Sequence, residues 1–400
     1  MSGPRPSVLF YCQHSLGMGH LVRSLALAAG LSAKFRVVLL SGGALPNGLR
    51  IPSEIKVIDL PPLGFDENMQ LISRDERTVE DAKEYRRQII LDTFDGLRPE
   101  VVLIELFPFG RKKFAAELLP LLEKARACGD RPMIVCSLRD ILVGQRRDQQ
   151  AHEERAAEQI NRYFDAILVH SDPTFARFEE SFHAKTPLEV PIYHTGFVSP
   201  DAKPFVPQSR ARRIVVSAGG GLVGEPLLRT AIEAHALLSQ SEGVELKAIA
   251  GPFFPEPAWE SLRCLARGRQ RVELCRFVPD LVSELRAAAG SISQCGYNTV
   301  LDLVRSEVPA LVVPYAQGKE DEQMKRARRL EAMGALRVLD QSHLSVERLA
   351  EEMRQLLRFT PRPARLELTG SERTGVILQN LLDRRETALA TSRESVGVSL

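Results

Sequence analysis

The sequence predicts an α/β protein built from two Rossmann-like, doubly wound parallel-sheet domains that face each other across a cleft. Two observations carry this prediction. Short apolar runs bounded by turn residues alternate with amphipathic helical patterns along most of the chain, and such alternation specifies βαβ units. The alternation also stops once, in residues 196–212, which contain three prolines and no periodicity, and it then starts again.

The length supports this division, because 400 residues are two to three times the size of an ordinary domain. We predict a first domain at 1–196, a linker at 197–212, a second domain at 213–370, a C-terminal helix at 371–384 and a disordered tail at 385–400. The expected strands are 8–12, 36–40, 56–60, 101–106, 133–137, 166–170, 213–217, 244–250, 272–275, 291–294, 310–313 and 336–339. The expected helices are 21–31, 79–94, 114–127, 148–163, 225–238, 257–267, 281–289, 299–305, 321–333, 346–357 and 372–382.

The composition excludes several classes of protein. Hydrophobic residues at 44% and charged residues at 26% are typical of a soluble globular chain. Lys and Arg number 53 against 51 Asp and Glu, a balance that argues against nucleic acid as a partner. No apolar run approaches a membrane span, and the N-terminal residues do not follow a signal-peptide pattern, so we expect a cytoplasmic protein. Six scattered cysteines without metal-ligand spacing predict reduced thiols, no metal site and no cofactor.

The first functional pattern follows the first predicted strand. Gly17 and Gly19 let the backbone turn sharply and approach a ligand, and His20 falls at the start of the next helix. A helix N-terminus favours the neutral imidazole that a general base needs, although His20 could instead cap the helix or pack between the domains. Glu105, at the end of a strand, is the first candidate for a carboxylate that orients this ring, and Asp140 is the second.

A second glycine loop follows the first strand of the second half. Gly219, Gly221 and Gly224 satisfy the GxGxxG pattern, which would suggest a dinucleotide site. That pattern also requires an acidic residue at the end of the next strand, where this chain has Lys247 followed by apolar residues and Gly251. The remaining interpretation is a loop whose backbone N–H groups bind an anion, most simply a phosphate.

The third pattern opens a helix after a short strand. Asn298 and Thr299 can cap that helix, and their side chains and free N–H groups can also bind diphosphate oxygens. Asp302, one turn later, is placed to accept hydrogen bonds from a ribose. Glu322 and Gln323 begin the following helix, where acidic and amide groups suit sugar hydroxyls, although such residues also favour ordinary first turns.

Residues 294–332 resemble the donor-binding segment of nucleotide-sugar glycosyltransferases of the GT-B fold, where the familiar form is His-Cys-Gly-Trp-Asn-Ser followed by an acid, Gly-Val-Pro and Asp/Glu-Gln. The GMGHLVRSLALA stretch, the glycine loop from Ser217 and the FVPDL stretch are similar to the MurG-like group, which carries a glycosyltransferase family 28 type C-terminal domain. Gln294 stands where the plant-type proteins have His, and Asp302 stands in place of a usual Glu.

The resemblance implies a metal-independent transferase that moves a sugar from a nucleotide-diphosphate donor, by resemblance a UDP-sugar, to an acceptor hydroxyl. It implies that His20 acts as the base, that Phe277 and Val278 contact the nucleobase, and that Glu322 with Gln323 binds the transferred sugar. The donor-binding residues expected in this way are Gly17, Gly19, Ser217, Gly219, Gly220, Gly221, Phe277, Val278, Gln294, Gly296, Asn298, Thr299, Asp302, Glu322 and Gln323.

Two other functions stay open at this point. The GMGHLVR stretch also resembles a nucleotide-sugar hydrolase of the same fold, in which water replaces the acceptor, and a protein that binds the donor without chemistry is the third alternative. The acceptor could be a sugar, a lipid-linked molecule or a small molecule. Aromatic and basic residues interleave between Phe107 and Phe114, which suits either a core-packing loop or peripheral contact with the inner face of a membrane.

Overall fold

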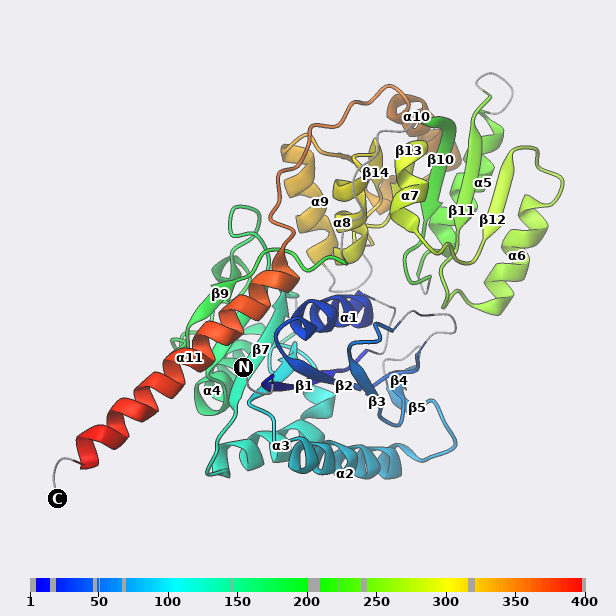
Figure 1. Ribbon diagram of the computed structural model, residues 1–400. Helices are drawn as coiled ribbons and strands as arrows, with labels where there is room; N and C mark the ends of the chain where they lie inside the picture. The colour runs from blue at the N-terminus through cyan, green and yellow to red at the C-terminus, as the bar shows by residue number, and fades with distance from the viewer. Residues whose placement is uncertain are drawn as a thin grey trace.

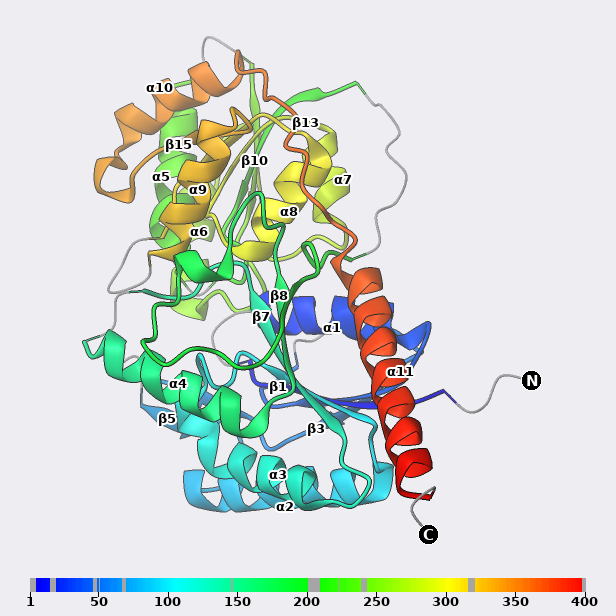
Figure 2. The same cartoon turned by 90° about the vertical axis from the view of Figure 1, so that its left-hand side faces the viewer.

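The computed structural model describes residues 5–14, 19–45, 49, 51–66, 70–144, 147–200, 209–221, 223–238, 243–315 and 321–397. The chain folds into two lobes, and each lobe is built on one parallel β-sheet flanked by helices (Figures 1 and 2). The predicted α/β class with two doubly wound parallel sheets is confirmed.

The first lobe contains a seven-stranded sheet in the order β3-β2-β1-β6-β7-β8-β9. Successive side chains of β1 (Ser7–Cys12) enter two different cores, because neighbouring residues of a strand point to opposite faces. Leu9 and Tyr11 pack with residues of α2, α3 and α4, whereas Val8 and Phe10 pack with residues of α1 and α11. The other elements are β2 (Arg36–Ser41), β3 (Lys56–Asp59), β6 (Val101–Glu105), β7 (Met133–Arg139), β8 (Ala166–His170), β9 (Ile192–His194), α1 (Gly19–Ser32), α2 (Val79–Leu97), α3 (Ala115–Ala127), α4 (Gln149–Tyr163) and α11 (Gly370–Gly397).

The second lobe repeats this plan with six strands in the order β12-β11-β10-β13-β14-β15. In both sheets the chain leaves the first strand in one direction and later returns to its other side, so β1 and β10 mark the points where the strand order reverses. Ligands of such sheets bind at the carboxyl ends of the strands beside that point. The elements are β10 (Ala211–Ser217), β11 (Glu245–Ile249), β12 (Val272–Cys275), β13 (Ala288–Ser293), β14 (Ala310–Val312), β15 (Arg337–Val338), α5 (Glu225–Ala236), α6 (Glu256–Ala266), α7 (Leu281–Arg286), α8 (Tyr297–Ser306), α9 (Glu322–Ala332) and α10 (Val346–Leu356).

The C-terminal helix α11 returns from the second lobe to the first and lies along it (Figures 1 and 2). Leu378 and Leu382 pack into the same core as Leu27 and Leu31 of α1. The helix continues to Gly397, which corrects the expectation of a disordered tail from residue 385. Residues 385–391 include Arg, Glu, Ala and Leu, which are strong helix formers, and extending a formed helix needs no new nucleation.

Three short strands were not predicted: β4 (Leu63–Phe65) and β5 (Leu71–Ser73), which pair antiparallel, and the edge strand β9. Each has only three residues, too few for a period-two pattern to stand out. The predicted linker, 197–212, begins after β9, and its last two residues belong to β10; residues 201–208 fall outside the described part.

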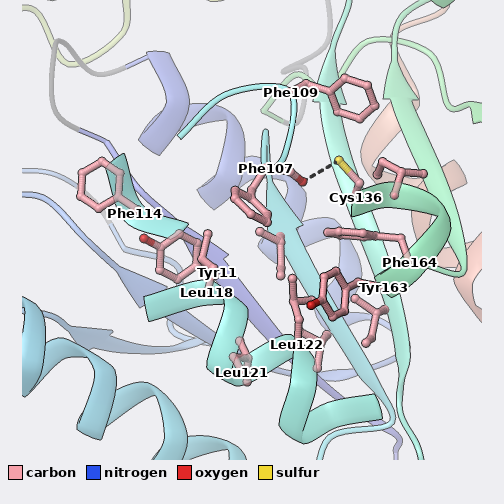
Figure 3. Packing of buried hydrophobic residues seen from close by; sticks show 14 of the residues in the cluster. Tyr11, Phe107, Phe109, Phe114, Leu118, Leu121, Leu122, Cys136, Tyr163 and Phe164 are labelled. Atoms are coloured by element: carbon pink, nitrogen blue, oxygen red, sulfur yellow. Dashed lines mark hydrogen bonds between the residues drawn. The ribbon is translucent and has the colours of Figure 1, made fainter. Parts of the chain in front are cut away.

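The aromatic segment after β6 belongs to the core of the first lobe. Phe107, Phe109 and Phe114 are each 2% exposed and pack with side chains such as Tyr11 and Leu118, as Figure 3 shows. The proposed membrane contact through this segment is therefore wrong, because its rings cannot reach lipid. No helix among the described residues is long and apolar enough to span a bilayer.

A buried ion pair joins the two lobes. Asp140, just after β7 in the first lobe, accepts two hydrogen bonds from Arg326 of α9, at 2.7 Å to Nε and 2.9 Å to Nη2. Arg326 Nη1 also donates to the carbonyl oxygen of Cys295 at 2.7 Å, within the second lobe. Both charged side chains are almost fully buried, so neither can exchange its partner for water.

The substitution Arg326→Met tests this contact. We expect it to lower the free energy of unfolding by about 3–5 kcal/mol, because Asp140 would remain buried without a counter-charge. Urea unfolding followed by far-UV circular dichroism measures the change. The matched control is Arg328→Met, which removes an exposed pair with Glu331 and should cost about 0.5 kcal/mol or less. Equal effects of the two variants would contradict the assigned role.

Candidate active site

The candidate site lies where α1 of the first lobe meets α8 of the second (Figure 1). Asn298 Nδ2, in the first turn of α8, donates a hydrogen bond of 3.1 Å to the carbonyl oxygen of Gly19, the first residue of α1. Helix α1 follows β1, and α8 follows β13, the neighbour of β10. The carboxyl edges of the two sheets therefore meet here, each beside its point of strand-order reversal.

His20 and Glu105, the two residues predicted to be catalytic, contact each other. Glu105 ends β6, its side chain is fully buried, and its Oε1 lies 2.7 Å from Nδ1 of His20. A carboxylate can only accept here, so Nδ1 carries the proton and Nε2 keeps its lone pair. The His20 side chain is 19% exposed, and within the described part of the chain nothing hydrogen-bonds Nε2. The ring thus has a fixed tautomer and a free basic nitrogen.

Two arginines share the same carboxylate. Arg23, on the next turn of α1, donates to Glu105 Oε1, and Arg111 Nη2 lies 3.5 Å from Glu105 Oε2. Burial raises the pKa of Glu105, but the His20 ring and the two guanidinium groups outweigh burial and hold that pKa well below its usual range. Burial lowers the pKa of His20 to about 3, although Glu105 acts in the opposite direction, so the ring is neutral at neutral pH.

Arg23 also connects this pair of residues to the second lobe. Its guanidinium lies 5.2 Å from the centre of the Tyr297 ring, at the start of α8. The Tyr297 hydroxyl donates to the carbonyl oxygen of His170 at 3.0 Å and accepts from the Val198 N–H at 2.9 Å. The residue that precedes Asn298 is therefore fixed against the first lobe, and the position of the Asn298 side chain depends on how the lobes pack.

The glycine loop between β10 and α5 lies beside the start of α8. Gly219 and Gly221 have φ angles of +60° and +98°, and a Cβ on Gly221 would come within 2.6 Å of a backbone oxygen, so glycine is required there. A Cβ on Gly219 would lie 3.8 Å from Thr299 Oγ1. Gly220 lies between the two glycines, and buried Ser217 accepts the Gly219 N–H at 3.3 Å. The predicted diphosphate residues of two loops are thus neighbours.

The residues expected to bind the nucleoside lie on two adjacent segments. Phe277 is 55% exposed in the loop between β12 and α7, whereas Val278 packs partly against the core. Asp302 lies on α8, which packs against α7. Burial raises the pKa of Asp302 to about 7, opposed by Arg305 and assisted by Asp280. Phe277 is thus an exposed ring in the loop before α7, and Asp302 is a carboxyl group on the helix that packs against α7.

The residues expected to bind the transferred sugar begin α9. Gln323 Oε1 accepts the N–H groups of Cys295 at 3.0 Å and Tyr315 at 3.1 Å, which fixes the orientation of its amide. Glu322 is buried against the first lobe, with Oε1 3.2 Å from Arg139 Nη1, and its Oε2 has no hydrogen-bond partner among the described residues. Glu322 therefore lies at the junction of the two lobes, whereas Gln323 is held within the second lobe.

The remaining predicted residues have mixed outcomes. Gln294 Nε2 donates to the Val223 carbonyl oxygen at 3.2 Å, and Gly296 is the N-cap of α8. Gly17 lies outside the described residues. Asp140, the second candidate for orienting His20, instead forms the ion pair between the lobes.

Sequence reasoning missed the cations around the site: Arg23, Arg111 and Arg139. Arg23 could have been found, because it lies three residues after His20 and so falls on the same helix face. Arg111 lies in the loop after β6 and Arg139 ends β7, both at the carboxyl edge of the first sheet. The partner of Arg139 is Glu322, far away in the sequence, so that contact could not be predicted. Within the described ranges, no cluster of three or more His, Cys, Asp or Glu residues could hold a metal ion.

The likeness to solved structures defines the class of fold. The calicheamicin glycosyltransferase CalG4 is similar with a TM-score of 0.58 and 17% identity, over 96% of this chain and 99% of that one. MurG from Acinetobacter baumannii is similar with a TM-score of 0.55 and 18% identity, over 94% of this chain and all of that one. Identities this low show the fold alone, and the chain has the GT-B fold that its motifs predicted.

The sequence of the second lobe is similar to a known family of domains. Residues 215–373 match the glycosyltransferase family 28 C-terminal domain. Two relatives share the name UDP-N-acetylglucosamine--N-acetylmuramyl-(pentapeptide) pyrophosphoryl-undecaprenol N-acetylglucosamine transferase. The one from Chromohalobacter salexigens is 28% identical over 53% of this chain and 58% of its own length. The one from Alkalilimnicola ehrlichii is 38% identical over 24% of this chain and 27% of its own.

The matched part therefore spans less than two thirds of either relative. The MurG-like resemblance inferred from the motifs is confirmed for the fold and for the C-terminal domain. It does not by itself transfer the relatives' substrates to this chain.

The protonation state of His20 is directly testable. We expect its ring to stay neutral from pH 5 to 8 with the proton on Nδ1, because burial lowers its pKa and Glu105 accepts from that nitrogen. Long-range ¹⁵N–¹H correlation spectra of the imidazole nitrogens measure this, and the His20→Gln variant identifies the signal by its loss. A proton on Nε2, or titration inside this range, would contradict the geometry.

Proposed function

We propose that the protein is a glycosyltransferase that moves a sugar from a nucleotide-diphosphate donor, a UDP-sugar, to an acceptor hydroxyl without a metal ion. The observation that carries the proposal is the His20–Glu105 contact of 2.7 Å, placed directly beside the Asn298 turn of the second lobe. A histidine with a free basic nitrogen and a helix start suited to phosphate are thus held together by the packing of the lobes.

The second lobe supplies the groups that stabilise the leaving diphosphate. Helix α8 carries partial positive charge at its N-terminus, with Gly296 as N-cap, and the Gly219–Gly221 turn lies next to Thr299. When the bond between the anomeric carbon and the diphosphate oxygen breaks, the electron pair stays with the diphosphate. Backbone N–H groups fixed before the reaction stabilise that charge without reorganisation. In this proposal, Asp302 accepts hydrogen bonds from the ribose hydroxyls and Phe277 contacts the nucleobase.

The first lobe supplies the base. The acceptor oxygen forms a bond to the anomeric carbon while its proton passes to His20 Nε2, and Glu105 stabilises the resulting imidazolium through Nδ1. In this proposal, Glu322 and Gln323 hold the hydroxyls of the sugar during the transfer. Gln323 is pre-oriented by two backbone N–H groups, which supports a positioning role.

The names of the relatives favour a lipid-linked acceptor, since both names include a pyrophosphoryl-undecaprenol substrate. We extend this class of acceptor to the present chain as part of the proposal. A lipid-linked acceptor would bring the protein to the inner face of the membrane that presents it. The buried rings of residues 107–114 would take no part in that contact.

Replacing His20 tests the proposed reaction. We expect His20→Ala to lower acceptor-dependent turnover by 10²–10⁴-fold, because the acceptor proton loses its base. Nucleotide affinity, measured by calorimetry with UDP, GDP and dTDP, should stay within about twofold, since in this proposal the imidazole does not hold the nucleotide. His343→Ala, at an exposed histidine far along the second lobe, is the matched control. Full turnover by His20→Ala would contradict the assignment.

The same assay separates the alternatives. Release of free sugar from the donor without any acceptor would indicate a hydrolase. Tight nucleotide binding with no turnover, in the presence of soluble and lipid-linked acceptors, would indicate a binding protein. Transfer to an acceptor, with little release to water, supports the transferase.

Asp302 predicts a pH dependence for donor binding. A carboxylate accepts hydrogen bonds from ribose hydroxyls, whereas a protonated carboxyl accepts them poorly. The affinity for the donor should therefore rise as the pH increases through about 7. If only the ionised form binds, affinity for an intact UDP-sugar increases roughly tenfold from pH 6 to 8. Calorimetry measures this, because the donor's phosphates do not titrate in that range. Asp302→Asn should abolish this dependence of donor affinity on pH, whereas the control Asp130→Asn, at an exposed position, should keep it. A pH dependence that Asp302→Asn retains would refute the proposed contact between Asp302 and the ribose.

A further inference from the structure

Arg23 contacts groups of both lobes at the candidate site. It lies on α1, three residues after His20, and its side chain is 3% exposed. Its guanidinium donates to the Glu105 carboxylate of the first lobe and lies 5.2 Å from the centre of the Tyr297 ring of the second. The proposed reaction uses His20 and Glu105 but gives this buried arginine no part.

One carboxylate oxygen holds Arg23 and His20 together. Glu105 Oε1 lies 2.7 Å from His20 Nδ1 and also accepts a hydrogen bond from Arg23 Nη2. Arg23 Nη2 lies 3.4 Å from His20 Nδ1, and since both nitrogens carry a proton, neither can accept from the other. A charge-assisted hydrogen bond restrains a carboxylate more strongly than a neutral one does. The direction in which Glu105 points, and with it the orientation of the imidazole, therefore depends on Arg23.

The second lobe restrains Arg23 through Tyr297. The face of an aromatic ring attracts a guanidinium, and more strongly where water is excluded, as it is around these two buried side chains. The ring is fixed in turn, because its hydroxyl donates to the His170 carbonyl oxygen at 3.0 Å and accepts from the Val198 N–H at 2.9 Å. Phe197 packs on it, with the ring centres 5.6 Å apart. A movement of Tyr297 would therefore take a contact away from Arg23.

Tyr297 belongs to the turn that was expected to bind the donor. It is the first residue of α8 and is followed directly by Asn298 and Thr299, the expected diphosphate ligands. Asn298 Nδ2 donates to the carbonyl oxygen of Gly19, the first residue of α1. Because neighbouring residues of one helical turn move together, the docking of this turn on the first lobe and the restraint on Arg23 are linked.

We propose that Arg23 is a positioning residue that aligns Glu105, and through it His20, only while Tyr297 of the second lobe lies against its guanidinium. This inference rests on the proposed transferase function, because it names a further residue that the His20 base requires. The base is then ordered when the α8 turn, which carries the donor contacts, is docked on the first lobe. When the turn is undocked, Arg23 loses the ring, Glu105 gains freedom to turn, and the imidazole is no longer held for proton transfer.

Nuclear magnetic resonance tests the alignment without any substrate. In wild type, long-range ¹⁵N–¹H correlation spectra should show His20 with its proton on Nδ1. We expect Arg23→Met and Tyr297→Leu each to give a mixture of the two tautomers, although Tyr297→Leu changes no charge. Tyr297→Phe removes the hydrogen bonds of the hydroxyl but keeps the ring, so His20 should keep its proton on Nδ1. This variant separates the effect of the ring from the general docking of the lobes.

Turnover tests the coupling through a double-mutant cycle. We expect Arg23→Met and Tyr297→Leu each to lower kcat for sugar transfer by about 10- to 100-fold, because a misplaced base costs this much. Arg23→Met should leave nucleotide affinity within about twofold. The double variant should be no slower than Arg23→Met alone, since the ring acts through the arginine. Arg23→Lys keeps a charge that can bind Glu105 and the ring, so it should recover part of the loss, and it decides the question if Arg23→Met does not fold.

A second arginine–tyrosine pair provides the matched control. Arg77 also lies 5.2 Å from the centre of a tyrosine ring, that of Tyr85 on α2, but this ring is 53% exposed. Arg77→Met, Tyr85→Leu and the double variant remove the same groups as the first cycle does. They should leave kcat and the His20 spectrum unchanged.

The outcomes separate this inference from the proposed function. Effects of Arg23→Met and Tyr297→Leu that multiply in the double variant, or a single Nδ1 tautomer in both variants, overturn the positioning role. Equal effects of Tyr297→Phe and Tyr297→Leu also overturn it, because the ring would then have no part. If wild type transfers sugar to no acceptor, the transferase proposal fails, whereas the spectra still decide whether Arg23 aligns the histidine.

Discussion

The arrangement of this site depends on the buried ion pair between Asp140 and Arg326. Two charges removed from water are stable only when each satisfies the other, so the pair permits essentially one relative placement of the lobes. Arg326 also holds the Cys295 carbonyl oxygen, immediately before the turn that starts α8. The contact that orients the lobes therefore also positions the start of α8 against α1, and a shift of either lobe would separate Asn298 from Gly19.

This packing brings together groups that repel one another unless an anion is present. The N-terminal ends of α1 and α8 meet, and both carry partial positive charge. Arg23 and Arg111 add full charges on the first-lobe side, with Glu105 as the shared carboxylate. Such a junction is suited to substrates rich in phosphate. Its neutral histidine can remain neutral because burial disfavours a further charge among these cations.

The fold could be predicted from the sequence because each βαβ unit is specified locally. The strands β1 and β10 are short apolar runs, and the glycine loop that follows β10 requires backbone angles open mainly to glycine. The cationic environment could not be predicted in this way, since Arg23 and Glu105 are 82 residues apart in the sequence and meet through tertiary packing. The segment from Phe107 to Phe114 shows the limit most clearly. The interleaved aromatic and basic residues of this segment are compatible with a lipid-binding surface and with a buried loop. The burial of its aromatic rings in the folded protein distinguishes the two.

The shared carboxylate also explains how binding and basicity can be coupled. As long as Glu105 is drawn toward two guanidinium groups, it supports a charged His20 ring only weakly, and burial dominates the pKa of that ring. Negative charge that arrives with a bound substrate would compensate these arginines, favour the imidazolium and so strengthen Nε2 as a base. The histidine would then become a more effective proton acceptor when the substrate is in place.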